Sequence, residues 1–109
     1  MSDAKIRAII KRPDEKYGHV TNISPSLRNL QRIVEGPIET VPVGFNSVLI
    51  CNEEGKLRNL PRNFYMGIRP FGDLIVGEVV IVGVDGEEFC DCQISFDTWK
   101  FLIDKWRDQ

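Results

Sequence analysis

Apolar and polar residues alternate near the start of the chain in the pattern of a β-hairpin. Residues 5–11 place apolar side chains at alternate positions, interrupted at Ile9, which is typical of a strand with one buried face. Pro13 then ends the strand, because proline cannot donate a hydrogen bond to a ladder. Residues 19–23 are predicted to form a short second strand that pairs with the first.

The spacing then changes to a helical period with signals at both ends. We expect Ser24 to be the N-cap and Pro25 to be the first helical residue, because the φ of proline is already helical. We expect Gly36 to end the helix in the left-handed conformation. The apolar stripe between these ends comprises Leu27, Leu30, Ile33 and Val34.

Later stretches favour strands. Residues 37–43 follow a period of two in their apolar positions, which predicts a strand. Residues 47–51 are almost continuously apolar, which predicts a central strand. Residues 74–84 form the most apolar stretch and are rich in β-branched side chains, and Gly77 within it indicates a bend or a bulge. Residues 87–92 are predicted to be a final short strand or an extended arm.

The C-terminal residues 96–107 are predicted to form a second helix, capped by Ser95 or Asp97. Its apolar stripe is rich in aromatic side chains, each of which can bury roughly 150–250 Å². The helix therefore either covers the sheet or forms a subunit interface, and we favour the first. The stripe comprises Phe96, Trp99, Leu102, Ile103 and Trp106.

Residues 56–73 fit no period for long. We expect a short strand or turn at 56–59, a helical turn from Pro61 and then a loop. Together the elements predict a single α+β domain over residues 1–109. It would contain a curved, mainly antiparallel sheet of five or six strands, one helix after the first hairpin and a C-terminal amphipathic helix.

Composition excludes several classes of protein. The chain has 109 residues, of which 42% are hydrophobic and 28% charged, and this suits one globular domain. No apolar run approaches the roughly 18 residues of a membrane span, so no membrane association is expected. Three cysteines do not make a disulfide framework and no secretory signal peptide is recognisable, so we expect a cytoplasmic protein. A net charge of −2 argues against a binder of long nucleic acid.

Charge is distributed unevenly along the chain. Over residues 1–70, Lys and Arg exceed Asp and Glu by four, whereas over residues 71–109 Asp and Glu exceed Lys and Arg by six. Such a chain can dock head to tail with another copy of itself, or can simply present a solvated acidic surface. Together with the aromatic helix, this polarity leads us to expect a homo-oligomer.

No motif indicates catalysis, a cofactor or a metal. His19 is the single histidine, and no nucleophile-elbow motif accompanies it. Cys90 and Cys92 have C-x-C spacing, which on a strand directs the two sulfurs to opposite faces and favours a buried structural role over a zinc site. Residues 82–86 lack the spacing of a phosphate-binding loop. We therefore expect a protein that is not an enzyme and has no cofactor.

The stretch without a period holds the candidate binding residues. Arginine suits phosphate, asparagine suits amide-like edges, and aromatic rings offer faces on which a base can stack. This mixture is compatible with an ordinary loop, a protein interface or a pocket for a small nucleotide. The candidates are Arg58, Asn59, Arg62, Asn63, Phe64, Tyr65, Arg69 and Phe71.

Several blocks of the chain resemble a domain-of-unknown-function family that is frequent in phage and conjugative-element genomes. The most specific is Cys-Asn-Glu-Glu-Gly-Lys-Leu at 51–57, and the resemblance covers about residues 6–89. The other blocks are Arg-Ala-Ile-Ile at 7–10, the helical stretch 27–34 with Gly36, Ile-Glu-Thr-Val at 38–41, Leu-Pro-Arg-Asn at 60–63, the glycine-punctuated run 75–83 and Asp-Gly-Glu-Glu-Phe at 85–89.

The resemblance implies an accessory protein of a mobile element and no known activity. We expect such a non-enzyme to act against host defence by sequestering a cyclic nucleotide or cyclic-ADP-ribose-type immune signal as a homo-oligomer. The alternative is a stoichiometric inhibitor that binds a host defence nuclease or effector. A structural or regulatory protein of the element itself is a third possibility.

Overall fold

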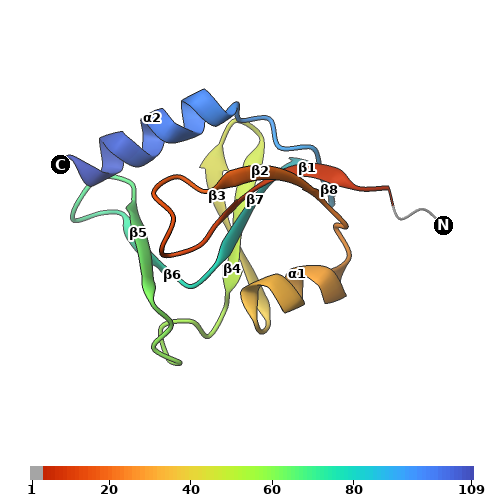
Figure 1. Ribbon diagram of the computed structural model, residues 1–109, viewed down its shortest axis with the longest axis horizontal. Helices are drawn as coiled ribbons and strands as arrows, with labels where there is room; N and C mark the ends of the chain where they lie inside the picture. The colour runs from red at the N-terminus through yellow and green to blue at the C-terminus, as the bar shows by residue number, and fades with distance from the viewer. Residues whose placement is uncertain (1–3) are drawn as a thin grey trace.

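The computed structural model of the chain describes residues 4–109, which fold into eight strands and two helices (Figure 1). In chain order the elements are β1 (Ile6–Lys11), β2 (His19–Ile23), α1 (Leu27–Val34), β3 (Ile38–Gly44), β4 (Ser47–Asn52), β5 (Arg62–Met66), β6 (Asp73–Val76), β7 (Val79–Asp85), β8 (Glu88–Cys90) and α2 (Phe96–Arg107).

Six of these strands form one sheet in which all paired strands run antiparallel. Its order is β2-β1-β7-β4-β3, and β8 pairs with the last residues of β7. The strand β7 lies at the centre of this order. Its first five residues, 79–83, are all buried, as expected of a nearly continuous apolar run. The structure confirms the predicted α+β class, the mainly antiparallel sheet and the C-terminal helix.

The apolar stretch 74–84 is two strands and not one. Gly77 separates β6 from β7 and has a φ of +76°, a conformation that favours glycine. A Cβ at this position would also lie 2.9 Å from the Cδ1 atom of Leu60, so that side chain would have to shift. As a result β6 leaves the main sheet and pairs with β5 in a separate two-stranded sheet.

Residues 56–73, which we expect to be irregular, therefore contain the strand β5. The prediction of a helical turn from Pro61 is wrong. The reason is a contact with the C-terminal helix. The ring of Phe64 in β5 stacks on Trp106, with ring centroids 5.9 Å apart, and meets Trp99 edge-on at 5.8 Å. This packing fixes the backbone of β5, and a local sequence period cannot show it.

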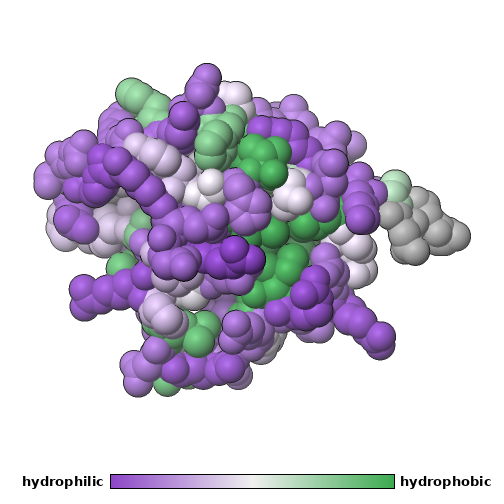
Figure 2. All heavy atoms as spheres, in the orientation of Figure 1, coloured by the Kyte–Doolittle hydropathy of each residue, from purple (hydrophilic) through white to green (hydrophobic). Residues whose placement is uncertain are grey.

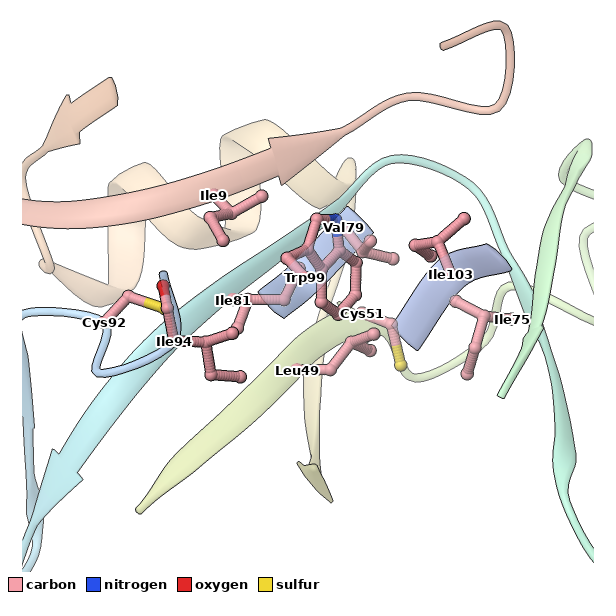
Figure 3. Packing of buried hydrophobic residues seen from close by; sticks show 10 residues of the cluster. All are labelled: Ile9, Leu49, Cys51, Ile75, Val79, Ile81, Cys92, Ile94, Trp99 and Ile103. Carbon is pink, nitrogen blue, oxygen red and sulfur yellow. The ribbon is translucent and has the colours of Figure 1, made fainter. Parts of the chain in front are cut away.

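The helix α2 covers one face of the main sheet, as predicted. Trp99 is fully buried, and Figure 3 shows it among side chains from β1, β4 and β7 such as Ile9 and Leu49. Its indole Nε1 donates a hydrogen bond to the carbonyl oxygen of Tyr17 at 2.8 Å. Ser95 is the N-cap, because its hydroxyl accepts a hydrogen bond from the backbone N–H of Thr98.

The helix α1 covers only part of the opposite face. It packs mainly over β3, β4 and β7, where Leu30, Ile33 and Val34 meet Ile50 and the buried valines of β7. The part of this face that β1 and β2 form is therefore less covered (Figure 1).

Both ends of α1 differ from the prediction. Ser26, not Ser24, is the N-cap and accepts a hydrogen bond from the backbone N–H of Asn29 at 3.2 Å, so Pro25 precedes the helix. Glu35, not Gly36, takes the left-handed conformation, with a φ of 67°. Gly36 is needed for space instead, because a Cβ there would lie 2.7 Å from the side-chain nitrogen of Asn52.

Candidate functional site

The less covered part of the sheet forms a groove between β2 and α1. Its volume is about 390 Å³, within the range of roughly 300–1,000 Å³ that is typical of small-molecule sites. Its lining is mainly polar, and Figure 2 shows some hydrophobic surface between these elements among hydrophilic residues. We call it the ligand groove, and it is lined by Lys5, Ile10, Arg12, His19, Thr21, Asn22, Ile23, Ser24, Asn29, Arg32, Ile33 and Glu78.

Three isoleucines supply the apolar lining of the ligand groove. Ile10 comes from β1, Ile23 from β2 and Ile33 from α1, and all three are buried. Alternation along β2 places His19 and Thr21 on the same face as Ile23. Two half-buried polar side chains thus stand on a sheet face whose other inward residues are mainly apolar.

Positive charge dominates the rest of the lining. Lys5, Arg12 and Arg32 face a single carboxylate, that of Glu78. The Nε atom of Arg12 lies 3.8 Å from Glu78 Oε1, and the Arg12 side chain is 55% exposed, so this pair is loose and well solvated. Arg32 donates a hydrogen bond to the uncharged side-chain oxygen of Asn29 at 2.7 Å, which orients its guanidinium.

A hydrogen bond fixes the His19 ring at one end of the ligand groove. Its Nδ1 atom lies 2.9 Å from Glu15 Oε2. Burial alone would raise the pKa of Glu15, but the backbone N–H of Arg12 and the His19 ring together lower it. Glu15 therefore holds His19 in place as a carboxylate.

A second cavity, of about 380 Å³, lies beyond the Arg12–Glu78 pair, which lines both cavities. Its lining is mainly apolar, and three carboxylates stand around it. We call it the apolar pocket, and it is lined by Arg12, Pro13, Asp14, Val34, Glu35, Leu60, Pro61, Gly77 and Glu78.

The eight binding residues predicted from the sequence are not gathered in one place. Arg58 and Asn59 lie in the turn before β5, where Arg58 donates a hydrogen bond to the carbonyl oxygen of Glu35 at 2.6 Å and Asn59 has a φ of 55°. Arg58 thereby supplies a hydrogen-bond donor to a carbonyl group at the C-terminal end of α1, where carbonyl groups have no partner within the helix. Arg62 is exposed at the first position of β5.

Three of the eight line a smaller cavity of about 230 Å³. Asn63, Phe64 and Tyr65 meet there with Lys11, which is only 2% exposed. The Lys11 ammonium donates a hydrogen bond to Asn63 Oδ1 at 2.6 Å and lies 5.5 Å from the centroid of the Phe64 ring. Burial lowers the pKa of Lys11, and the charges of Glu15 and Asp14 act in the opposite direction.

The last two predicted residues lie in the loop that connects β5 to β6. The Arg69 guanidinium stands over the Tyr65 ring at 4.5 Å, so this arginine already has an aromatic partner. Phe71 is 90% exposed. The eight predicted residues thus lie in the turn before β5, in β5 itself and in the loop after it, and they do not line one common cavity.

Cysteine and metal chemistry add no second site. Cys51 and Cys92 are buried, and burial is the main cause that raises the pKa of the Cys51 thiol to about 11. Over residues 4–109, no group of three or more His, Cys, Asp or Glu side chains is arranged to hold a metal ion. No helix within the same range is both long and apolar enough to cross a membrane.

A family model matches residues 6–100 of the chain. The chain belongs to this family, a domain of unknown function (DUF3846). Searches of curated proteins and of solved structures found no similar protein. The DUF3846 match confirms the resemblance to a domain-of-unknown-function family and extends past residue 89 into α2.

The DUF3846 region includes every residue of the ligand groove except Lys5. Sequence reasoning does not find this groove, because Arg32 reads as part of the polar face of a helix and His19 as a surface residue of a hairpin. The one available signal is β2 itself, in which two polar residues share a face with Ile23. That signal indicates a sheet face that its helix does not fully cover.

Proposed function

We propose that the chain is a non-enzymatic binding protein that takes a small nucleotide-type anion in the ligand groove. The observation that carries this proposal is the combination of three cations with a floor of three isoleucines in a groove of about 390 Å³. A nucleotide needs both features, because its base is largely apolar on its faces and its phosphates are charged.

The lining offers a role for each part of such a ligand. The isoleucine floor suits the flat face of a base, and the hydroxyl of Thr21, which shares a face with Ile23, can donate to and accept from its edge. Arg12 and Arg32 suit phosphate oxygens, because a guanidinium forms paired hydrogen bonds with them. The net charge of −2 fits a local anion site better than a surface for long nucleic acid.

The polar groups of the ligand groove are held in fixed positions by one another, which suits binding. The ring of His19 is already hydrogen-bonded to Glu15, and Asn29 is occupied by Ser24 and Arg32. A protein that binds a signal and releases it unchanged withdraws that signal from solution. Sequestration of a cyclic nucleotide or cyclic-ADP-ribose-type signal by a mobile-element accessory protein is the use that we propose for this groove.

Thermal unfolding against a panel of ligands tests this function. The panel comprises cyclic dinucleotides, cyclic trinucleotides, cyclic ADP-ribose isomers, mononucleotides and inorganic phosphate. A ligand present at 100 times its dissociation constant should stabilise the fold by about 2.7 kcal/mol, and chromatography should recover it intact. Phosphate alone should shift the melting temperature less, because it cannot use the isoleucine floor.

Two arginines on one helix provide a matched pair of variants. Arg32→Gln should weaken binding, whereas Arg28→Gln should not, because Arg28 is exposed on α1 and does not line the groove. Absence of any shift across the panel would refute the proposed function. An equal loss of binding in both variants would show that the effect is one of general charge and not of this groove.

A further inference from the structure

The loop between β5 and β6 presents two large apolar side chains to solvent. Phe71 is 90% exposed and Ile68 is 67% exposed, and they stand at the two ends of one tight turn. An exposed leucine or isoleucine alone is ordinary, but a nearly fully exposed phenylalanine beside a second apolar side chain is typical of an interaction site.

This loop is held in place and does not owe its exposure to a lack of contacts. The backbone N–H of Phe71 donates to the carbonyl oxygen of Ile68 at 2.8 Å. The side chain of Gln109 donates to the carbonyl oxygen of Gly67 and accepts from the backbone N–H of Arg69, both at 2.7 Å. An anchor that is already ordered loses little conformational entropy when it binds.

The apolar pocket is a suitable receptor for an aromatic side chain. Pro13, Leu60 and Pro61 supply apolar surface, and the volume is about 380 Å³. The Phe71 side chain of the same molecule is at the far end of the hairpin, because β5 (Arg62–Met66) runs from beside Pro61 to the start of the loop. Five extended residues span roughly 16 Å, so the fit requires a second molecule.

Charge is complementary as well. Arg69 stands two residues from Phe71, and Asp14, Glu35 and Glu78 surround the apolar pocket beside a single arginine, Arg12. A cation next to an aromatic anchor would therefore meet an excess of negative charge. Such complementarity selects the partner and the orientation of an interface.

We propose that a second copy of this chain inserts Phe71 into the apolar pocket, with Arg69 against its carboxylates. The two surfaces differ, so the contact is head to tail and leads to a ring or an open chain of subunits. The apolar pocket shares Arg12 and Glu78 with the ligand groove, which places the neighbouring subunit beside the proposed ligand. The proposal does not depend on the proposed function, since it concerns a different cavity.

Native mass spectrometry and light scattering over a wide range of protein concentration test the contact. The unchanged chain should form oligomers whose average size increases with concentration. Phe71→Ser removes the anchor, and Pro61→Arg fills the pocket and repels Arg69, so each variant alone should be monomeric. Leu57→Ser is the control, because Leu57 is 88% exposed but belongs neither to the loop nor to the apolar pocket.

Mixing the two variants gives the decisive result. The Phe71→Ser chain retains the pocket and the Pro61→Arg chain retains the anchor, so an equal mixture should form a one-to-one heterodimer and nothing larger. A monomer at every concentration would overturn the proposal, and so would oligomers that survive Phe71→Ser. Failure of the mixture to form a heterodimer, with both variants shown to be folded by circular dichroism, would overturn the head-to-tail arrangement.

Discussion

Asn63 shows how one side chain can be essential to the fold without contacting a ligand. Its amide donates hydrogen bonds to the carbonyl oxygens of Lys11, at 3.0 Å, and Gly77, at 2.7 Å. Its side-chain oxygen accepts from the Lys11 ammonium. Asn63 thus joins β1, β5 and the link between β6 and β7, and it supplies a polar contact to a buried cation.

Removing this amide should destabilise the protein strongly. Asn63→Leu removes the donor to two carbonyl groups and the shorter of the two hydrogen bonds that the buried Lys11 ammonium makes, and we expect a loss of about 3 kcal/mol in the free energy of unfolding. Urea denaturation measures it. The neighbouring variant Arg62→Ala is the control and should change stability by less than about 0.5 kcal/mol, because Arg62 is exposed. A loss of similar size in both variants would contradict the role of Asn63.

Glu15 should make stability depend on pH in a predictable direction. Its pKa in the folded protein is below the ordinary value of 4.5, so the ionised form is favoured by folding. The stabilisation is therefore present above pH 4.5 and is lost as the pH falls through the folded-state pKa. The difference in melting temperature between the unchanged chain and Glu15→Gln should favour the unchanged chain at neutral pH and disappear in acid. A difference that grows in acid would contradict this sign.

At the scale of elements, the sequence predicts what local patterns determine. The heavy aromatic stripe of α2 and the alternation of β1 are local, so both elements match their predicted residues closely. The N-cap of α1 is harder, because Ser24 and Ser26 are chemically equal. In the structure Asn29 contacts both serines: its backbone N–H donates to the Ser26 hydroxyl, which caps the helix, and its side chain donates to the Ser24 carbonyl oxygen.

The strand β5 and the ligand groove could not be predicted for a related reason. Phe64 becomes part of a strand because two tryptophans more than 30 residues away along the chain pack on it. The ligand groove exists because α1 packs over β3, β4 and β7 and leaves β1 and β2 less covered. Residue types indicate binding chemistry, but only the placement of elements decides which residues share a cavity.

The whole molecule consists of a main sheet with a small hairpin attached at one side (Figure 1). The main sheet has a core on both faces, whereas the hairpin of β5 and β6 is joined to it through aromatic contacts with α2, through Ile75 and through the hydrogen bonds of Asn63. Trp106 is central to this junction, because it stacks on Phe64 and meets Trp99 at 6.0 Å.

Cooperativity should follow this division of the molecule. Trp106→Ala removes the stacking partner of Phe64 but only one of the contacts of Trp99, which the main sheet continues to bury. We therefore expect faster amide hydrogen exchange in β5 and β6 and nearly unchanged exchange in β7, because local opening costs less than global unfolding. Phe101→Ala, on the exposed side of the same helix, is the control. Faster exchange in β7 as well would show that the hairpin and the main sheet unfold as one unit.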